Sequence, residues 1–129
     1  MMITKFNLYT ENVNNFENFD LLVRTTNFKY VIEVTLVINK NNFLTLKLGH
    51  YDLFSKNFIL YPFEKPRQEN RNFLKEIDDS NVFFTLIETI KNSDYFLEHV
   101  NKYLQNNEDW FELMIQKYEK KFKLNDFNL

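Results

Sequence analysis

The chain has 129 residues, one glycine (Gly49) and no cysteine, and its 16 basic and 18 acidic side chains give a formal net charge of −2. A single glycine cannot supply the glycine-rich loops of phosphate and dinucleotide sites, which need several unobstructed backbone N–H groups. The lack of cysteine excludes disulfides and cysteine-ligated zinc, and the balanced charge argues against nucleic acid as the primary ligand.

The length fits a single domain over residues 1–129. The first residues lack the pattern of a signal peptide, and the longest nearly uncharged apolar stretch, 34–38, is far too short to span a bilayer. We therefore expect a cytoplasmic protein that needs no cofactor and has no membrane contact. Asn and Lys are abundant while Gly, Ala and Arg are scarce, which indicates an AT-rich genome. The 15 Phe and 7 Tyr are in part a product of that bias.

The first half of the chain predicts β-strands. Alternating residues predict a short strand over 4–8, and an Asn-rich turn follows over 11–15. A second strand is expected to start with the apolar residues at 21–23 and to end at Asn27. Alternation is strongest over 28–38, where one face carries Phe28, Tyr30, Ile32, Val34, Leu36 and Ile38. The opposite face is expected to be mostly solvated and carries Lys29, Val31, Glu33, Thr35 and Val37.

A turn over 39–42 predicts a hairpin with a return strand over 43–48. Another strand over 58–61 ends at Pro62, and the polar stretch 62–72 is the longest expected loop. Beyond it the apolar spacing changes to a helical period, which predicts three helices between about 79 and 123. Expected N-terminal caps of these helices are Asp78, Asp79 or Ser80, then Ser93 or Asp94, and then Asn106 or Asn107.

Strands followed by helices predict an α+β fold: an antiparallel sheet of four or five strands in the N-terminal half, covered on one face by three C-terminal helices. The strands 28–38 and 43–48 should form its central hairpin. The expected core comprises Phe28, Tyr30, Ile32, Val34, Leu36, Leu44, Leu46, Phe83, Leu86, Ile87, Val100, Met114 and Tyr118.

The tetrapeptide at 49–52 offers the only pattern suggestive of catalysis. His50 with Asp52 could serve as a general base or as half of a metal site. The favoured interpretation is a turn in which Gly49 supplies a positive φ and His50 is exposed. Because no third catalytic group accompanies the pair, we expect no catalytic residues and no metal site. His99, on the second helix, is expected at the surface or its boundary.

Candidate partner contacts lie in the 61–71 stretch and at Trp110. Tyr61 and Phe63 precede Arg67 and Arg71, and loops with aromatic and arginine side chains often recognise other proteins. A disordered connector is the alternative for this stretch. Trp110 is first interpreted as closing the core over the start of the third helix, and otherwise as an exposed partner anchor.

These features favour a small inhibitor that binds another protein stoichiometrically, such as a toxin-immunity protein or a phage anti-defence (anti-CRISPR-like) protein. The expected partner is a toxin, nuclease or defence effector. One alternative is a metal-dependent nuclease or hydrolase centred on His50 and Asp52. The other is a subunit of a nucleoprotein assembly, suggested by Lys117, Lys120, Lys121 and Lys123, although cations near a helix C-terminus also suit the macrodipole.

Overall fold

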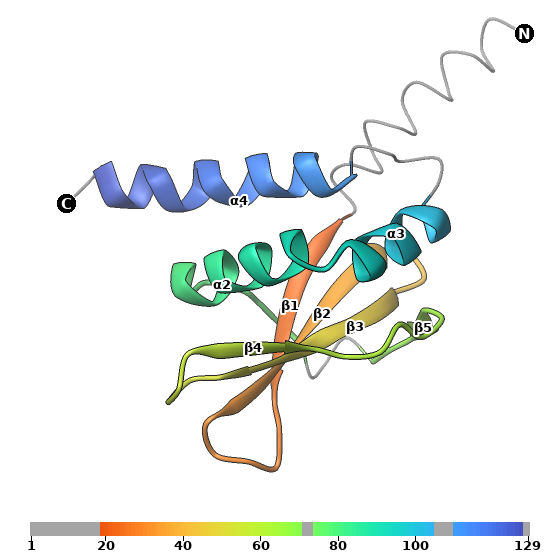
Figure 1. The fold of residues 1–129 in the computed structure, drawn as a ribbon, viewed down its shortest axis with the longest axis horizontal. Coiled ribbons are helices and arrows are strands. Elements are labelled where there is room, and N and C mark those ends of the chain that lie inside the picture. Colours follow the sequence, from red (N-terminus) through yellow and green to blue (C-terminus); the bar gives the residue numbers. More distant parts are fainter. Residues whose placement is uncertain (1–18, 71–73, 105–109, 128–129) are drawn as a thin grey trace, which may run out of the picture.

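The structure is a computed structural model that describes residues 19–70, 74–104 and 110–127, with side chains up to residue 123. It has the expected α+β fold, an antiparallel sheet followed by three helices (Figure 1). The strands are β1 (Asp20–Thr25), β2 (Val31–Asn39), β3 (Leu44–Asp52), β4 (Asn57–Leu60), β5 (Arg67–Gln68) and β6 (Lys75–Glu76). The helices are α2 (Ser80–Lys91), α3 (Asp94–Tyr103) and α4 (Trp110–Phe127). The strand expected over 4–8 lies outside the described residues.

The strand order is β4-β3-β2-β1-β6, and β5 pairs with β3. Strands β2 and β3 form the central hairpin, as predicted. Its turn is fixed by the Asn39 side chain, whose Oδ1 accepts the N–H groups of Asn41 at 2.9 Å and Asn42 at 3.3 Å. Phe43 completes the turn with a φ of 47°. An asparagine-bonded turn thus replaces the Asn-Gly turn that this glycine-poor chain lacks.

Gly49 has a different role from the one expected. It lies inside β3, opposite Leu60 of β4, and it has no positive φ, so the predicted turn at 49–52 is wrong. A Cβ atom at this position would lie 2.1 Å from the Ile59 carbonyl oxygen. The register of β2 and β3 also shifts between Val34 and Thr35, beside Gly49. The glycine therefore permits close approach of β4 to an irregular part of β3.

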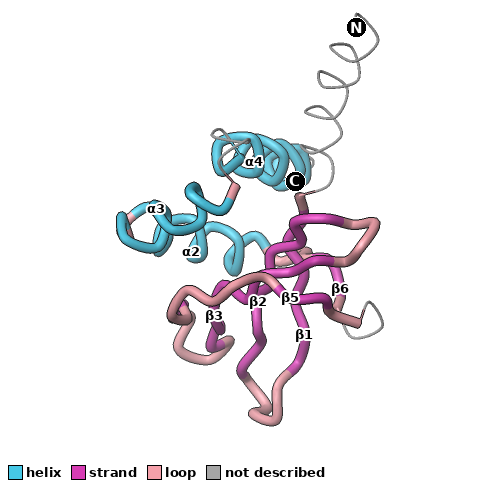
Figure 2. Tube along the Cα trace, turned by 90° about the vertical axis from the view of Figure 1, so that its right-hand side faces the viewer, coloured by secondary structure: helices cyan, strands magenta, loops and turns pink. Residues whose placement is uncertain are grey.

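The three helices form a layer on one face of the sheet (Figure 2). Asp79 caps α2, as expected, because its carboxylate accepts the N–H groups of Asn81 and Val82. The predicted apolar stripes of the helices are buried against the sheet, with only Leu97 partly exposed. They comprise Val82, Phe83, Leu86, Ile87 and Ile90 on α2, Phe96, Val100 and Leu104 on or next to α3, and Phe111, Met114, Ile115, Tyr118 and Phe122 on α4. This packing supplies the stability that helices without alanine need.

The prediction that Phe28 and Tyr30 belong to the core is wrong. Phe28 is 73% exposed and Tyr30 is 51% exposed. Strand β2 begins only at Val31, so both rings belong to the turn between β1 and β2, at the end of the sheet away from the helices (Figure 1). Ile32 and Leu44 are half-buried rather than buried.

The prediction of a solvated opposite face is also wrong, since Glu33, Thr35 and Val37 are buried. The reason is topological: the chain passes from β5, beside β3, to β6, at the β1 edge of the sheet. On the way, Glu69 reaches Arg24 with a 3.6 Å ion pair. Leu74 lines a small hollow together with Leu22 and Val37. A segment distant in sequence therefore covers this face.

Candidate functional site

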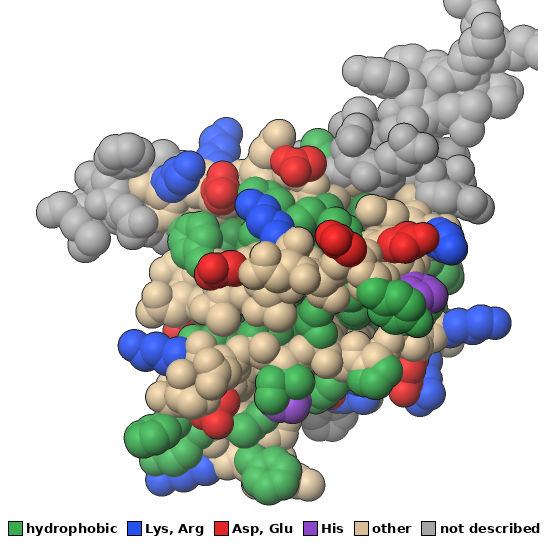
Figure 3. Space-filling model, viewed as in Figure 1, with side chains coloured by type: hydrophobic (Ala, Val, Ile, Leu, Met, Phe, Trp, Pro, Cys, Tyr) green, Lys and Arg blue, Asp and Glu red, His purple; other side chains and the backbone are tan. Residues whose placement is uncertain are grey.

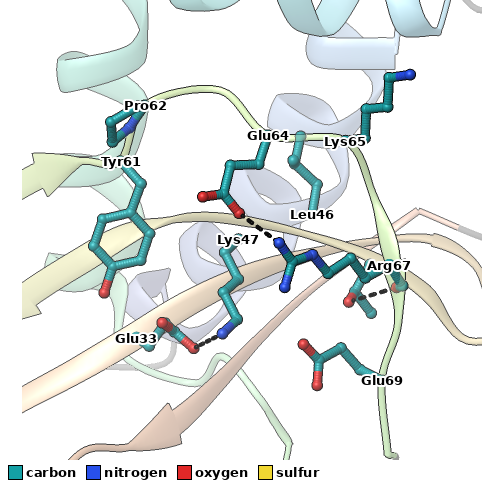
Figure 4. A pocket seen from close by; sticks show the side chains of 10 residues that line it. Glu33, Leu46, Lys47, Tyr61, Pro62, Glu64, Lys65, Arg67 and Glu69 are labelled. Carbon is teal, nitrogen blue, oxygen red and sulfur yellow. Dashed lines mark hydrogen bonds and ion pairs between the residues drawn. The ribbon is translucent and has the colours of Figure 1, made fainter.

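The stretch from Tyr61 to Glu69, here called the 61–69 surface, is fixed to the sheet at both ends. The Tyr61 N–H donates to the Leu48 carbonyl at 2.9 Å, and the Glu69 N–H donates to the Phe43 carbonyl at 3.1 Å. Between Tyr61 and the start of β5 at Arg67 the chain moves away from the edge of β3, and it borders a hollow of about 430 Å³ (Figure 4). The expected recognition loop is thus held in place, and it includes the short strand β5.

The hollow is lined by side chains of both charges. Its lining comprises Glu33, Thr45, Leu46, Lys47, Tyr61, Pro62, Glu64, Lys65, Arg67 and Glu69. Arg67 lies 3.5 Å from Glu64 and Lys47 lies 3.8 Å from Glu33 (Figure 4). These pairs largely neutralise one another, so the hollow presents a mixed polar surface.

Glu33 lies on the floor of the hollow and organises the charges there. Its residue is only 8% exposed, and its Oε1 accepts a hydrogen bond from Arg24 Nε at 2.6 Å. The pKa of the Tyr61 hydroxyl is raised above its ordinary value. The largest cause is burial, followed by the negative charge of Glu33 and the hydrogen bond to it. A buried carboxylate with two cationic partners and a tyrosine is a satisfied network. It holds β1, β2, β3 and the 61–69 surface in one geometry.

The residues predicted as partner contacts are only partly brought together. Tyr61 and Arg67 line the same hollow. Phe63 is half-buried and stacks on His99 of α3, with ring centroids 5.3 Å apart and an interplanar angle of 20°. His99 is half-buried as well, at the boundary position expected for it. Arg71 lies outside the described residues.

Trp110 occupies the core position that was its first interpretation. The residue is 1% exposed, and its ring packs against Phe19 and Phe111 with centroids 6.2 and 5.4 Å away. Its indole N–H donates to the Asn101 side-chain oxygen. Trp110 is separate from the hollow and is not among the residues that line it.

His50 and Asp52 lie two residues apart on β3, but their side chains contact different residues. The Asp52 carboxylate accepts the N–H groups of Phe54 at 2.8 Å and Ser55 at 3.2 Å, which shapes the β3–β4 turn. The His50 ring lies 5.5 Å from that of Tyr61. Among the described residues, no three His, Cys, Asp or Glu side chains are grouped so that they could hold a metal ion.

The lysines of the third helix lie in its middle turns, since α4 continues to Phe127 and its last turn has no basic residue. The macrodipole explanation is therefore wrong. Lys117 lies 3.7 Å from the Asp20 carboxylate, Lys121 lies 3.1 Å from Glu76 and Lys123 lies 3.7 Å from Glu119. These ion pairs give three of the four lysines a role within the fold.

Sequence reasoning missed a cluster of exposed apolar side chains, here called the aromatic tip and defined as Phe28, Tyr30, Leu53 and Phe54. All four are exposed, Phe54 by 83%. The β1–β2 and β3–β4 turns meet there, because the Leu53 N–H donates to the Tyr30 carbonyl at 2.7 Å. Hydrophobic side chains are visible at this lower end of the molecule (Figure 3). One signal existed in the sequence: Phe54 stands between Asp52 and Ser55, in a polar turn.

No helix among the described residues is long and apolar enough to cross a membrane. Comparisons of the chain with protein-family models, with curated proteins and with solved structures found no match.

Proposed function

We propose that this protein is a small inhibitor module that binds another protein stoichiometrically through the 61–69 surface. A toxin-immunity protein or a phage anti-defence protein acts in this way. The partner would be a toxin, a nuclease or a defence effector.

The observation that carries the proposal is the fixed, exposed geometry of the 61–69 surface. One end is hydrogen-bonded to Leu48 of β3 and the other to Phe43, the residue before β3, and Phe63 is stacked on α3. A surface that is already ordered loses little conformational entropy when a partner binds. The Arg67 side chain is 74% exposed beside the hollow, where its guanidinium could pair with a partner carboxylate.

Within this surface, we assign the anchoring role to Tyr61, Phe63 and Arg67. Arg71, which follows the surface in the sequence, is proposed as a further contact. Tyrosine and arginine are enriched among the residues that dominate binding energy at protein interfaces. Trp110 is left out of the proposed contact because it is buried in the core.

The test is capture of the partner from the native host. The tagged wild-type chain and its Arg67→Ala/Arg71→Ala variant are each used as bait, and bound proteins are identified by mass spectrometry. A matched control is Lys123→Ala, because Lys123, like Arg67, is exposed and ion-paired with a glutamate close to it in sequence, Glu119 for Lys123 and Glu64 for Arg67. We expect a protein retained by wild type and control but depleted from the double variant.

The genes beside the coding sequence separate the two proposed roles. A neighbouring toxin gene would favour immunity, whereas phage structural or regulatory genes would favour anti-defence. If no protein is enriched by wild-type bait over empty resin, the inhibitor proposal is contradicted.

A further inference from the structure

The aromatic tip is an exposed apolar end of the sheet that the proposed inhibitor function does not use. Phe28 and Phe54 are 73% and 83% exposed, and they stand on different turns. The Tyr30 and Phe54 rings lie 6.3 Å apart, which joins the two turns into one patch. Patches of this kind mark interaction sites in otherwise polar surfaces.

The exposed charges beside the tip are mainly positive. Lys29 lies between the two aromatic residues of the first turn, and its Nζ is 5.3 Å from the centre of the Tyr30 ring. Lys56 ends the second turn with a φ of 60° and is exposed. Among the residues that the structure describes, neither lysine is ion-paired with a carboxylate. The nearby carboxylate of Asp52 accepts two backbone N–H groups of its own turn.

We propose that the aromatic tip docks on an anionic membrane surface, with Phe28 and Phe54 entering the headgroup region and Lys29 and Lys56 contacting lipid phosphates. Aromatic rings favour the membrane–water interface. Lysines near the surface add attraction to anionic lipids. Both turns project from the same end of the sheet (Figure 1), so both can reach a flat surface at once.

A lipid surface fits these observations better than a protein cleft does. The rings stand on projecting turns, and a soft interface accepts projecting rings without a matching cavity. The expectation of no membrane contact rested on the lack of a signal-peptide pattern and of a spanning segment, and docking on a membrane surface needs neither. The exposure of Phe28 and Tyr30 supplies the apolar side chains that such docking needs.

The first test is co-sedimentation of the full chain with large unilamellar vesicles. One vesicle set is pure phosphatidylcholine, and the other contains equal parts of phosphatidylcholine and phosphatidylglycerol. Wild type should bind the anionic set and lose binding as salt screens the lysines. Lys29→Gln/Lys56→Gln should partition on the order of 30-fold more weakly, since each lysine contributes about a factor of five at an anionic surface.

The ring variant Phe28→Ser/Phe54→Ser should lose binding to the anionic vesicles. Its matched control is Tyr95→Ser, which removes another highly exposed aromatic ring, on α3 away from the tip. Circular dichroism and thermal melting of each variant show whether it is folded.

A second readout does not depend on loss of binding. Phe54→Trp places an indole at the tip, and its fluorescence should shift to the blue when anionic vesicles are added. The native Trp110 is buried and should give a constant background.

Failure of wild type to bind either vesicle set would overturn the proposal and leave the tip to a protein partner. Binding that survives in the ring variant would also overturn it, because the contact would then lie elsewhere. The inhibitor proposal is tested separately, since the tip variants leave Tyr61, Phe63 and Arg67 unchanged.

Discussion

The Tyr118 hydroxyl, on α4, donates a hydrogen bond to the carboxylate of Asp20, the first residue of β1. The same hydroxyl accepts the Leu21 N–H at 3.1 Å, and Lys117 donates to the Phe19 carbonyl at 3.2 Å. Tyr118 is fully buried. This contact between residues 98 positions apart fastens the last helix to the first described strand.

Replacing Tyr118 with phenylalanine should lower the free energy of unfolding by about 1–2 kcal/mol at pH 7, because a buried hydrogen bond to a carboxylate is lost. Urea unfolding followed by circular dichroism measures the change. Tyr103→Phe is the control: its ring is exposed on α3, and the loss should be below about 0.5 kcal/mol. Equal losses in the two variants would contradict the assigned role.

The contribution of Tyr118 to stability should depend on pH. Burial first, and then the Asp20 hydrogen bond and charge, raise the pKa of the Tyr118 hydroxyl far above its ordinary value of 10.0. Above pH 10 the Tyr118 hydroxyl loses its proton in the unfolded chain but keeps it in the folded protein. The contribution to stability is therefore complete below about pH 10 and decreases above it, by up to about 1.4 kcal/mol per pH unit.

Unfolding measured from pH 8 to pH 11 should show the stability advantage of wild type over Tyr118→Phe narrowing above pH 10. A difference that stays constant over this range would show that the folded-state pKa of Tyr118 is not raised.

Gly49→Ala should destabilise the fold by about 1–3 kcal/mol, because the new methyl group would collide with the Ile59 carbonyl and β4 would have to shift. Glycine-to-alanine changes at unstrained positions usually stabilise a protein instead. Asn57→Ala, at an exposed position of β4, is the control and should change stability by less than about 0.5 kcal/mol. Unchanged or increased stability of Gly49→Ala would disprove the close approach.

Asp52→Ala should lower stability by about 1 kcal/mol because two backbone N–H groups of the β3–β4 turn lose their acceptor. Asp52→Asn keeps an acceptor oxygen and should lose less. Both Asp52→Asn and His50→Ala should retain partner binding. A thermal-shift screen with Mg²⁺, Mn²⁺ and Zn²⁺ should show no stabilisation of wild type. A shift that Asp52→Asn abolishes would instead favour the metal-dependent enzyme.

The fold was predictable because its periodicities are strong. Alternation over 28–38 and helical spacing after residue 79 identify the central hairpin and the three helices. The same alternation misplaced Phe28 and Tyr30, because periodicity shows which residues share a face and not where the covering helices end. The alternation also placed Glu33 and Thr35 on a solvated face, which is wrong for a related reason. The segment that covers this face of β2 lies more than thirty residues later in the sequence.

The candidate site was predictable in part. The makeup of the 61–71 stretch drew attention to Tyr61 and Arg67, which line one hollow. Their neighbours Glu33 and Lys47 were not predicted, since these strand residues come under the segment only through the pairing of β2 with β3 and of β3 with β4 and β5. Trp110 could not be assigned from sequence because a tryptophan at a helix start suits both a core and an interface.

Biolayer interferometry of the captured partner with wild type, Arg67→Ala/Arg71→Ala and Lys123→Ala tests whether the 61–69 surface is the interface. We expect the double variant to bind at least about 30-fold more weakly, mainly through a faster off-rate, at an unchanged melting temperature. Lys123→Ala should bind like wild type. A double variant that binds as tightly as wild type would contradict the assignment of the 61–69 surface as the interface.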